Sequence, residues 1–99
     1  MFIQTVIITS ETELNPWPQP GPKVSELNSV RSQSVGFIST EQIRDPDNKK
    51  NTIIVKWNSI NDYYNFLTQN STLSLEAGRE RDNSYLQYNL TTSSHLSNQ

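Results

Sequence analysis

Few residues of this chain are able to act as acids, bases or metal ligands. There is no cysteine and only one histidine, His95, which lies in a polar stretch near the C-terminus. A histidine in such a stretch is expected to be solvated rather than to serve as a catalytic base. Without cysteine the chain has no disulfide, no thiolate metal site and no cysteine nucleophile. A mechanism based on histidine or cysteine is therefore not expected, and no metal site is expected either.

Acidic and basic residues alternate in one region, made up of Glu76, Arg79, Glu80, Arg81 and Asp82. Mixed charge of this kind is usually a solvated helix end of small energetic value, and only a buried member would indicate acid or base chemistry. The run from Asp45 to Asn51 is dense in turn-forming residues but lacks the later glycine and glutamate of a calcium loop. No phosphate-binding glycine loop, nucleophile elbow or zinc signature is present.

The composition indicates one domain with few apolar residues to bury in a core of its own. A chain of 99 residues has room for one core. Only 32% of the residues are hydrophobic, against roughly 45–50% in globular chains by a count that also includes glycine. Because a small domain already buries a small share of its surface, a second subunit is a natural source of further burial. We therefore expect a homodimer.

The net charge and the N-terminus exclude two classes of partner. A net charge of −2 and an isoelectric point near 5.2 provide no basic stripe for nucleic acid. The first nine residues are apolar, yet no basic region precedes them and no cleavage pattern follows. No run approaches the roughly 18 apolar residues needed to cross a bilayer. The expectation is a soluble, cytoplasmic protein that contacts neither nucleic acid nor membrane.

The first half of the chain predicts a strand, a loop, a helix and a hairpin. Phe2–Thr9 is rich in β-branched residues and predicts a strand. Glu11–Pro22 holds four of the five prolines and must be irregular. Within it Trp17 stands between two prolines, where its ring is either a lid or a plug. A narrow apolar stripe then predicts a helix from about Lys23 to Gln33, and an extended stretch runs from Val35 to about Arg44.

The second half predicts a strand, an interrupted helix and a last strand. Thr52–Trp57 is strongly β-branched, and Ser59 is a suitable N-cap for the helix that follows. That helix is expected to break around Asn70–Thr72, to resume, and to end at Gly78. Tyr85–Leu90 alternates as a last strand would. The single domain is thus expected to span residues 1–90, with residues 91–99 as a flexible polar tail.

The predicted order is strand, helix, strand, strand, helix, strand, which is the split βαβ pattern of ferredoxin-like α+β folds. Three stretches add detail: Ser34–Ser39 carries a Gly-Phe strand start, Ile54–Ser59 a Trp-x-Ser strand end, and Asp62–Leu67 an aromatic helix. This succession resembles the dimeric α/β barrel superfamily, in particular its antibiotic-biosynthesis-monooxygenase-like branch, over about Phe2–Leu90. The resemblance implies an antiparallel sheet with two helices on one face, a homodimer, and a pocket between sheet and helices.

The resemblance also implies a chemistry. Monooxygenases of that branch work without a cofactor: they bring a phenolic substrate to oxygen and use protein groups to remove a proton and orient the ring. It therefore implies no cofactor and a small aromatic ligand, with ligand-binding residues Trp57, Tyr64, Phe66 and Tyr88; Tyr63 and Arg79 are further candidates. No catalytic residue is assigned.

The haem-degrading branch fits less well. It uses an asparagine in the first strand and a tryptophan and a histidine near the second helix, whereas this chain has no asparagine in Phe2–Thr9 and places Phe66 and Glu76 at the other two positions.

Two functions remain open. One is a cofactor-free monooxygenase or related small-molecule enzyme acting on an aromatic or polyketide-like compound, which predicts an open apolar pocket. The other is a non-catalytic dimeric ligand-binding or structural module, which predicts a closed core because aromatic residues at helix and strand spacing commonly pack in cores.

Overall fold

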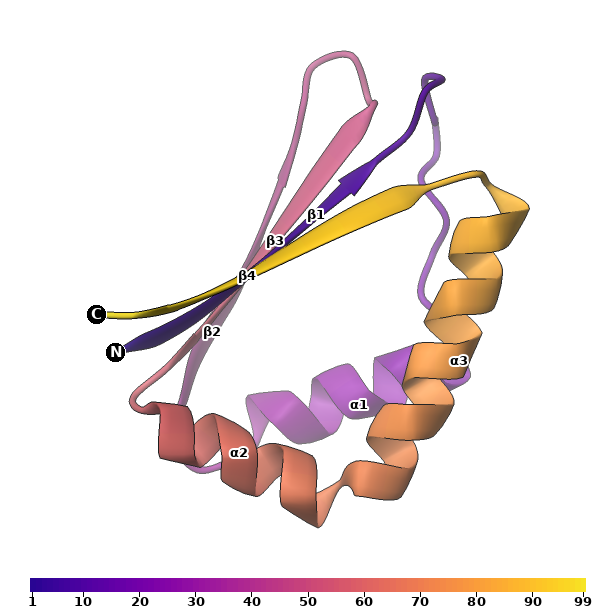
Figure 1. Ribbon diagram of the computed structural model, residues 1–99. Helices are drawn as coiled ribbons and strands as arrows, with labels where there is room; N and C mark the ends of the chain where they lie inside the picture. Colours follow the sequence, from indigo (N-terminus) through magenta and orange to yellow (C-terminus); the bar gives the residue numbers. More distant parts are fainter.

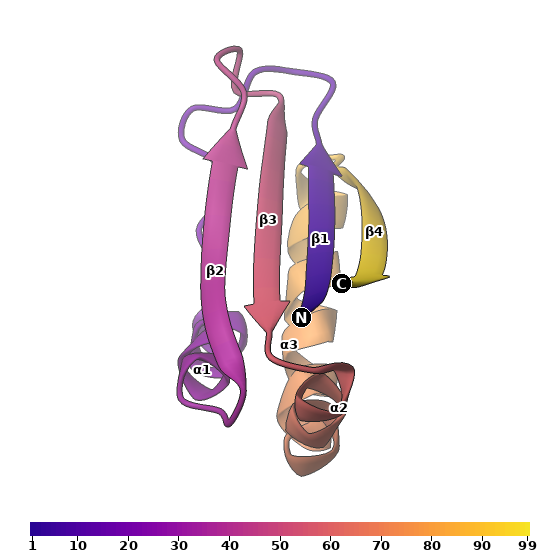
Figure 2. The ribbon, with the colours of Figure 1, turned by 90° about the vertical axis from the view of Figure 1, so that its left-hand side faces the viewer.

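The computed structural model describes all residues from Met1 to Gln99. Along the chain it contains β1 (Phe2–Thr9), α1 (Pro22–Ser32), β2 (Phe37–Arg44), β3 (Lys50–Trp57), α2 (Ile60–Gln69), α3 (Ser71–Gln87) and β4 (Thr91–Asn98). The strands form one antiparallel sheet in the order β2-β3-β1-β4. All three helices lie on one side of it (Figure 1), and its other face carries no helix (Figure 2). The ferredoxin-like α+β class expected from the sequence is confirmed.

The register of the sheet decides which side chains face the helices. Phe2 pairs with Trp57 of β3 and with Asn98 of β4. Because side chains alternate along a strand, every second residue of β1 from Phe2 shares the helix-facing side with its strand partners. That side includes Gln4, Val6 and Ile8. The opposite face carries an apolar centre contributed by three strands: Ile3, Ile7, Ile43 and Ile54.

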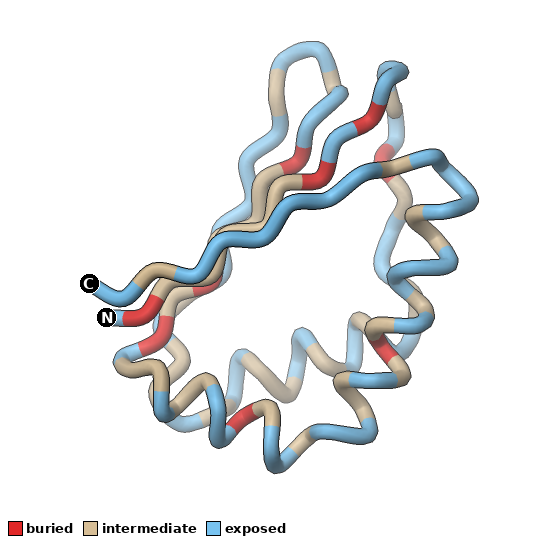
Figure 3. Tube along the Cα trace, in the orientation of Figure 1, coloured by how far each residue is buried: buried red, intermediate tan, exposed pale blue.

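The hydrophobic core occupies one end of the sheet. Phe2, Val55 and Trp57 of the sheet and Phe66 of α2 are buried together. Leu27 and Val30 of α1 and several residues of β2 and α2 pack around this cluster. Figure 3 shows how few other residues are buried.

The helical region after β3 begins and breaks as expected. The Ser59 hydroxyl accepts a hydrogen bond from the Asp62 backbone N–H at 3.2 Å and donates one to the Asp62 carboxylate at 3.0 Å. At the other end of α2, the Asn70 side chain donates to the Phe66 carbonyl at 2.9 Å. The same carbonyl accepts the Asn70 backbone N–H at 3.1 Å, and Asn70 is also the N-cap position of α3. The predicted interruption is confirmed, and it yields two helices rather than one.

The end of the chain differs from the prediction. Gly78 does not end a helix but lies within α3, and Tyr85–Leu90 is not a strand: Tyr85–Gln87 complete α3, and Tyr88–Leu90 form the connection. The expected flexible tail, residues 91–99, instead supplies β4 from Thr91 to Asn98. The helix continues past Gly78, and Glu80 beyond it accepts hydrogen bonds from backbone N–H groups at the start of α1. The polar segment becomes a strand because β1 needs partners for its backbone groups on that edge, and a main-chain ladder requires no apolar side chains.

The proline-rich loop covers the far end of the sheet. Trp17 is 3% exposed, and its indole N–H donates to the Asn48 carbonyl at 3.1 Å. The Arg44 guanidinium lies 5.9 Å from the centre of its ring. Trp17 is thus attached to the β2–β3 hairpin as a plug rather than a lid.

The chain on its own is less compact than its size predicts. Its surface is 6440 Å², whereas a folded monomer of 11.4 kDa should expose about 5,800 Å². Its radius of gyration is 13.8 Å, against about 12.6 Å for a compact domain of this length. Only nine residues are buried. None of the helices is long and apolar enough to span a bilayer.

Candidate functional site

Two of the four predicted ligand-binding residues come together. The rings of Trp57 and Phe66 are 5.4 Å apart. Trp57 has no exposed surface, and its indole N–H donates to the Gln4 side-chain oxygen at 3.0 Å. Phe37 meets it edge-on at 5.8 Å. These contacts satisfy Trp57 completely, so this end of the sheet is closed.

The other two residues lie away from this cluster. Tyr64 is 51% exposed on α2, and its one aromatic pair is with Tyr63, at 5.6 Å between ring centres. Tyr88 is 41% exposed just beyond α3 and takes part in none of the aromatic pairs. The ligand-binding role of the four residues remains a prediction.

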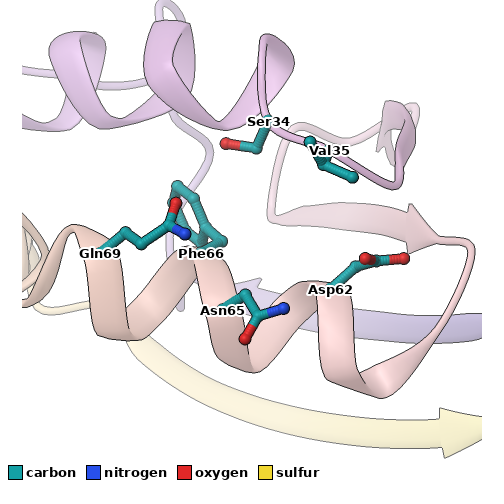
Figure 4. A pocket seen from close by; sticks show the side chains of 6 residues that line it. All are labelled: Ser34, Val35, Asp62, Asn65, Phe66 and Gln69. Atoms are coloured by element: carbon teal, nitrogen blue, oxygen red, sulfur yellow. The ribbon is translucent and has the colours of Figure 1, made fainter.

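A small pocket of about 190 Å³ lies between the C-terminal end of α1 and α2. Its lining is mostly polar (Figure 4) and consists of Ser34, Val35, Asp62, Asn65, Phe66 and Gln69. Asp62, which bonds the helix cap Ser59, has a structural role there. The volume is below the roughly 300–1,000 Å³ of sites for drug-sized ligands.

A second hollow, of about 100 Å³ and thus also below that range, lies between α3 and the β1–β4 edge of the sheet. It is lined by Val6, Arg81, Asp82, Tyr85, Thr92 and Ser94. The resemblance implies a pocket between sheet and helices, and this hollow lies in that region. It lies on the β1–β4 side toward the Thr9 end of the sheet, away from Trp57. We call it the α3–β4 cleft.

The α3–β4 cleft is open to solvent well beyond this hollow. On β4 the helix-facing residues opposite Ile8, Val6 and Gln4 are Thr92, Ser94 and Leu96. All three are exposed, Leu96 to 51%, although they face the helices. The backbone of α3 approaches α1 more closely than it approaches any strand. The helix-facing side of β4 therefore remains uncovered.

One face of α3 supplies the opposite wall. Ser74, Gly78, Arg81 and Tyr85 follow one another at offsets of 4, 7 and 11, which places them on one side of a helix. Arg81 and Tyr85 line the α3–β4 cleft, so this is the side that faces the sheet. Arg79, two residues from Arg81, is on the far side of α3 and exposed.

Two arginines and two tyrosines lie in two separate places: Arg31 and Tyr63 lie by the core cluster, whereas Arg81 and Tyr85 line the cleft. The Arg31 guanidinium lies 5.5 Å from the centre of the Phe66 ring. Burial lowers the pKa of Arg31, the nearby Tyr63 opposes that shift, and the like charge of Arg81 adds to it.

The two phenols remain protonated at neutral pH. Burial raises the pKa of Tyr63 above 10.0, Tyr64 raises it further, and Arg31 opposes the rise. Burial likewise raises the pKa of Tyr85, where Arg81 opposes the rise and Asp82 adds to it. A protonated phenol is a hydrogen-bond donor, so Tyr85 adds a hydroxyl donor to the exposed Arg81 guanidinium in the cleft lining.

The charged run on α3 has a structural role that the sequence did not reveal. The Glu80 carboxylate accepts hydrogen bonds from the backbone N–H groups of Lys23 at 3.1 Å and Val24 at 2.9 Å. The Lys23 ammonium pairs with Glu76 at 3.0 Å. Free N–H groups at a helix N-terminus attract anions. Glu80, which lies on α3, therefore caps the N-terminus of α1. No three His, Asp or Glu side chains lie together as a metal site.

Comparison with known proteins identifies the fold. No family model matches the chain, and no curated protein matches it by sequence. Three solved structures share its architecture. The cofactor-independent oxygenase SnoaB from Streptomyces nogalater is similar with a TM-score of 0.62 and 13% identity over 99% of this chain and 91% of that one. A mutant of SnoaB gives a TM-score of 0.63 and 15% identity over 99% and 92%.

A protein from Deinococcus radiodurans assigned as an antibiotic biosynthesis monooxygenase gives a TM-score of 0.58 and 11% identity over 100% of this chain and 92% of that one. Identities this low establish the fold alone. At that level they confirm the fold implied by the resemblance drawn from the sequence: the chain has the ferredoxin-like α+β fold of these oxygenase structures.

Proposed function

We propose that the protein is a cofactor-free monooxygenase or a related small-molecule enzyme acting on an aromatic or polyketide-like compound bound in the α3–β4 cleft. The observation that carries this proposal is the cleft itself, an accessible space between sheet and α3 where Arg81 and Tyr85 face Val6. The similarity in fold to a cofactor-independent oxygenase supports the reaction class.

The groups in the cleft suit the oxidation of a phenol. A guanidinium beside the phenolic oxygen favours loss of its proton and stabilises the negative charge that develops. Asp82 is the only carboxylate that lines the cleft and is the proton acceptor in this proposal. The electron-rich ring then reacts with oxygen: a phenol with a free para position and one O₂ give one quinone and one water. One oxygen atom enters the ring and the other leaves in the water.

The proposal includes a homodimer that forms through the bare face of the sheet. The apolar centre of that face, formed by Ile3, Ile7, Ile43 and Ile54, is covered by no helix (Figure 2). The excess surface and the shortage of buried residues support this. Pairing two such faces leaves the helix-side cleft of each subunit free.

Oxygen uptake tests the enzymatic proposal. An oxygen electrode would follow oxygen consumption by the full-length protein, dialysed against a chelator, with a panel of naphthols and tricyclic phenols that have a free para position. The expected result is uptake of one O₂ per quinone formed with at least one compound. The Arg81→Gln variant should lose most of this rate, whereas Arg79→Gln, the same change on the opposite face of α3, should retain it. Failure of the whole panel to bind or to consume oxygen would contradict the proposal.

One observation favours the alternative of a non-catalytic dimeric ligand-binding or structural module. Trp57 is fully enclosed, so the space next to it is a closed core rather than an open apolar pocket. Under the alternative, Arg81→Gln changes neither binding nor turnover, and Trp57→Phe affects stability alone. Retained folding with lost turnover in Arg81→Gln favours the enzyme.

A further inference from the structure

We propose that two copies of the chain pair through the bare face of the sheet with their two-fold axis along the strands, which places Glu41 of each subunit against His95 of the partner subunit. This inference rests on the homodimer of the proposed function. It adds the orientation of the two sheets and the polar contact that fixes it, and it gives a role to the one histidine of the chain.

One row of residues across the bare face ends in a carboxylate at one rim and an imidazole at the other. Glu41 of β2 is the register partner of Ile54 of β3. Ile54 in turn is opposite Thr5 of β1, and Thr5 is opposite His95 of β4. Because β2 and β4 are the edge strands (Figure 2), Glu41 and His95 lie at the two rims of this face. Both are exposed.

His95 has no charged neighbour on the bare face of its own subunit. The residues next to it there are uncharged: Thr5 lies opposite it, and Ser93 and Ser97 lie on either side of it along β4. His95 also takes part in none of the four ion pairs of the chain. An imidazole has an N–H donor whether it is neutral or protonated, so His95 presents a donor to a subunit that covers this face.

Glu41 is held in place and keeps one oxygen for a partner. The Lys56 ammonium donates to Glu41 Oε1 at 3.1 Å, which leaves Oε2 for another donor. The other cation of this face, Lys50, is at the end of β3 beside the hairpin. Sheets that pack face to face lie about 10 Å apart, a gap that a glutamate and a histidine close when they extend toward each other.

Symmetry turns this row into two matched contacts. In a two-fold interface, a residue that contacts a second residue on the partner is matched by the reverse contact. With aligned sheets, an axis along the strands through the centre of the sheet lays β2 over β4 of the partner and therefore Glu41 over the partner subunit's His95, at both rims. An axis across the strands lays each strand over its own copy and brings the two Glu41 carboxylates together. Complementary charge favours the first orientation.

Exchanging the two charges tests the orientation. Sedimentation equilibrium of the full-length protein would give the Kd of the dimer. His95→Glu sets carboxylate against carboxylate and should raise Kd by about tenfold or more, and Glu41→Lys, which removes the acceptor, should raise it too. The double variant, Glu41→Lys with His95→Glu, should bring Kd back below that of either single variant. Glu26→Lys, the same charge change on α1, should leave Kd unchanged.

The double variant separates the contact between subunits from effects within one subunit. Glu41→Lys also loses the pair with Lys56, but the double variant carries the same loss, so its recovery reports on the interface. With the axis across the strands, the double variant would set lysine against lysine and glutamate against glutamate and would stay weak. A double variant no tighter than the single variants therefore refutes the proposed orientation.

Cross-linking provides a second measurement that does not depend on charge. The chain has no cysteine, so introduced thiols are the only ones present. A short bis-maleimide should join the subunits of the double variant Glu41→Cys with His95→Cys into covalent dimers and should do so in neither single variant. Covalent dimers of Glu41→Cys alone would contradict the orientation.

The outcomes distinguish this inference from the proposed function. If the protein is a dimer that Ile54→Lys disrupts and the charge variants leave unchanged, the contact between Glu41 and His95 is refuted while the bare-face interface stands. A monomeric unaltered protein refutes both the inference and the homodimer. Oxygen uptake decides the enzymatic part of the proposed function in either case.

Discussion

Glu80 of α3 connects that helix to α1, a contact that the sequence pattern does not predict. Its carboxylate accepts from two N–H groups in the first turn of α1. The Glu80→Ala variant should lose about 1–2 kcal/mol of unfolding free energy, the usual value of a helix cap with its dipole interaction. Urea denaturation would measure it. Glu26→Ala is the matched control, since Glu26 has only an exposed contact at 4.0 Å with Lys23 and should change little; equal losses would show that Glu80 is no cap.

The two half-buried phenols predict a pH dependence of stability. Burial is the main reason that the pKa values of Tyr63 and Tyr85 exceed 10.0 in the folded protein. Between pH 10 and those raised values the folded state holds more protons than the unfolded state, so stability is constant below this range and falls as pH rises through it. Urea denaturation from pH 8 to 11 should show the fall, and a double variant, Tyr63→Phe with Tyr85→Phe, should show a smaller one. Identical profiles would contradict the assignment.

At this scale the sequence identified packing residues more readily than site residues. Trp57 and Phe66 were found because aromatic residues at regular spacing mark a buried face. Arg81 was not, because a charged residue on a helix looks the same whether it faces open solvent or a cleft. The sheet-facing series from Ser74 to Tyr85 was hidden for a further reason: Gly78 was read as the end of the helix.

Among the elements, two glycines give a sharp contrast. Gly36 precedes β2 with φ +83°, and an added Cβ would meet the Asp62 carboxylate. Gly78 lies within α3 with room for a Cβ. Gly36→Ala should destabilise the protein by more than about 1–2 kcal/mol, the cost of the left-handed backbone alone, whereas Gly78→Ala should stabilise it by about 0.5–1 kcal/mol. Thermal and urea unfolding would compare them; a destabilising Gly78→Ala would contradict a continuous α3.

Most elements were predictable because local chemistry defines them. The β-branched residues of β1 and β3, the Ser59 cap and the break at Asn70 all depend on neighbouring residues. β4 was not predictable in that way. Its residues are polar, and it is a strand because β1 offers an unpaired edge, which is a property of the folded sheet. The helix-facing residues of β4, Thr92 and Ser94, entered the candidate cleft only through that pairing.

For the molecule as a whole, the bare face of the sheet predicts self-association. Ile54 lies at the centre of that face, so Ile54→Lys would place a charge in a dimer interface. The protein should elute with the mass of a dimer in size exclusion with light scattering, and Ile54→Lys should shift it to the monomer. Leu86→Lys provides the control, because Leu86 is 76% exposed on α3. A monomeric unaltered protein, or a dimer unaffected by Ile54→Lys, would contradict this interface.

The central claim is that ligands bind between α3 and the β1–β4 edge. Its most direct test is a titration of isotope-labelled protein with 1-naphthol, followed by backbone and arginine side-chain NMR shifts. Saturable changes are expected at Val6, Ser94, Tyr85 and the Arg81 side chain, with little change at Ser34 and Asn65 in the other pocket. Changes confined to that other pocket, or none at millimolar ligand, would contradict it.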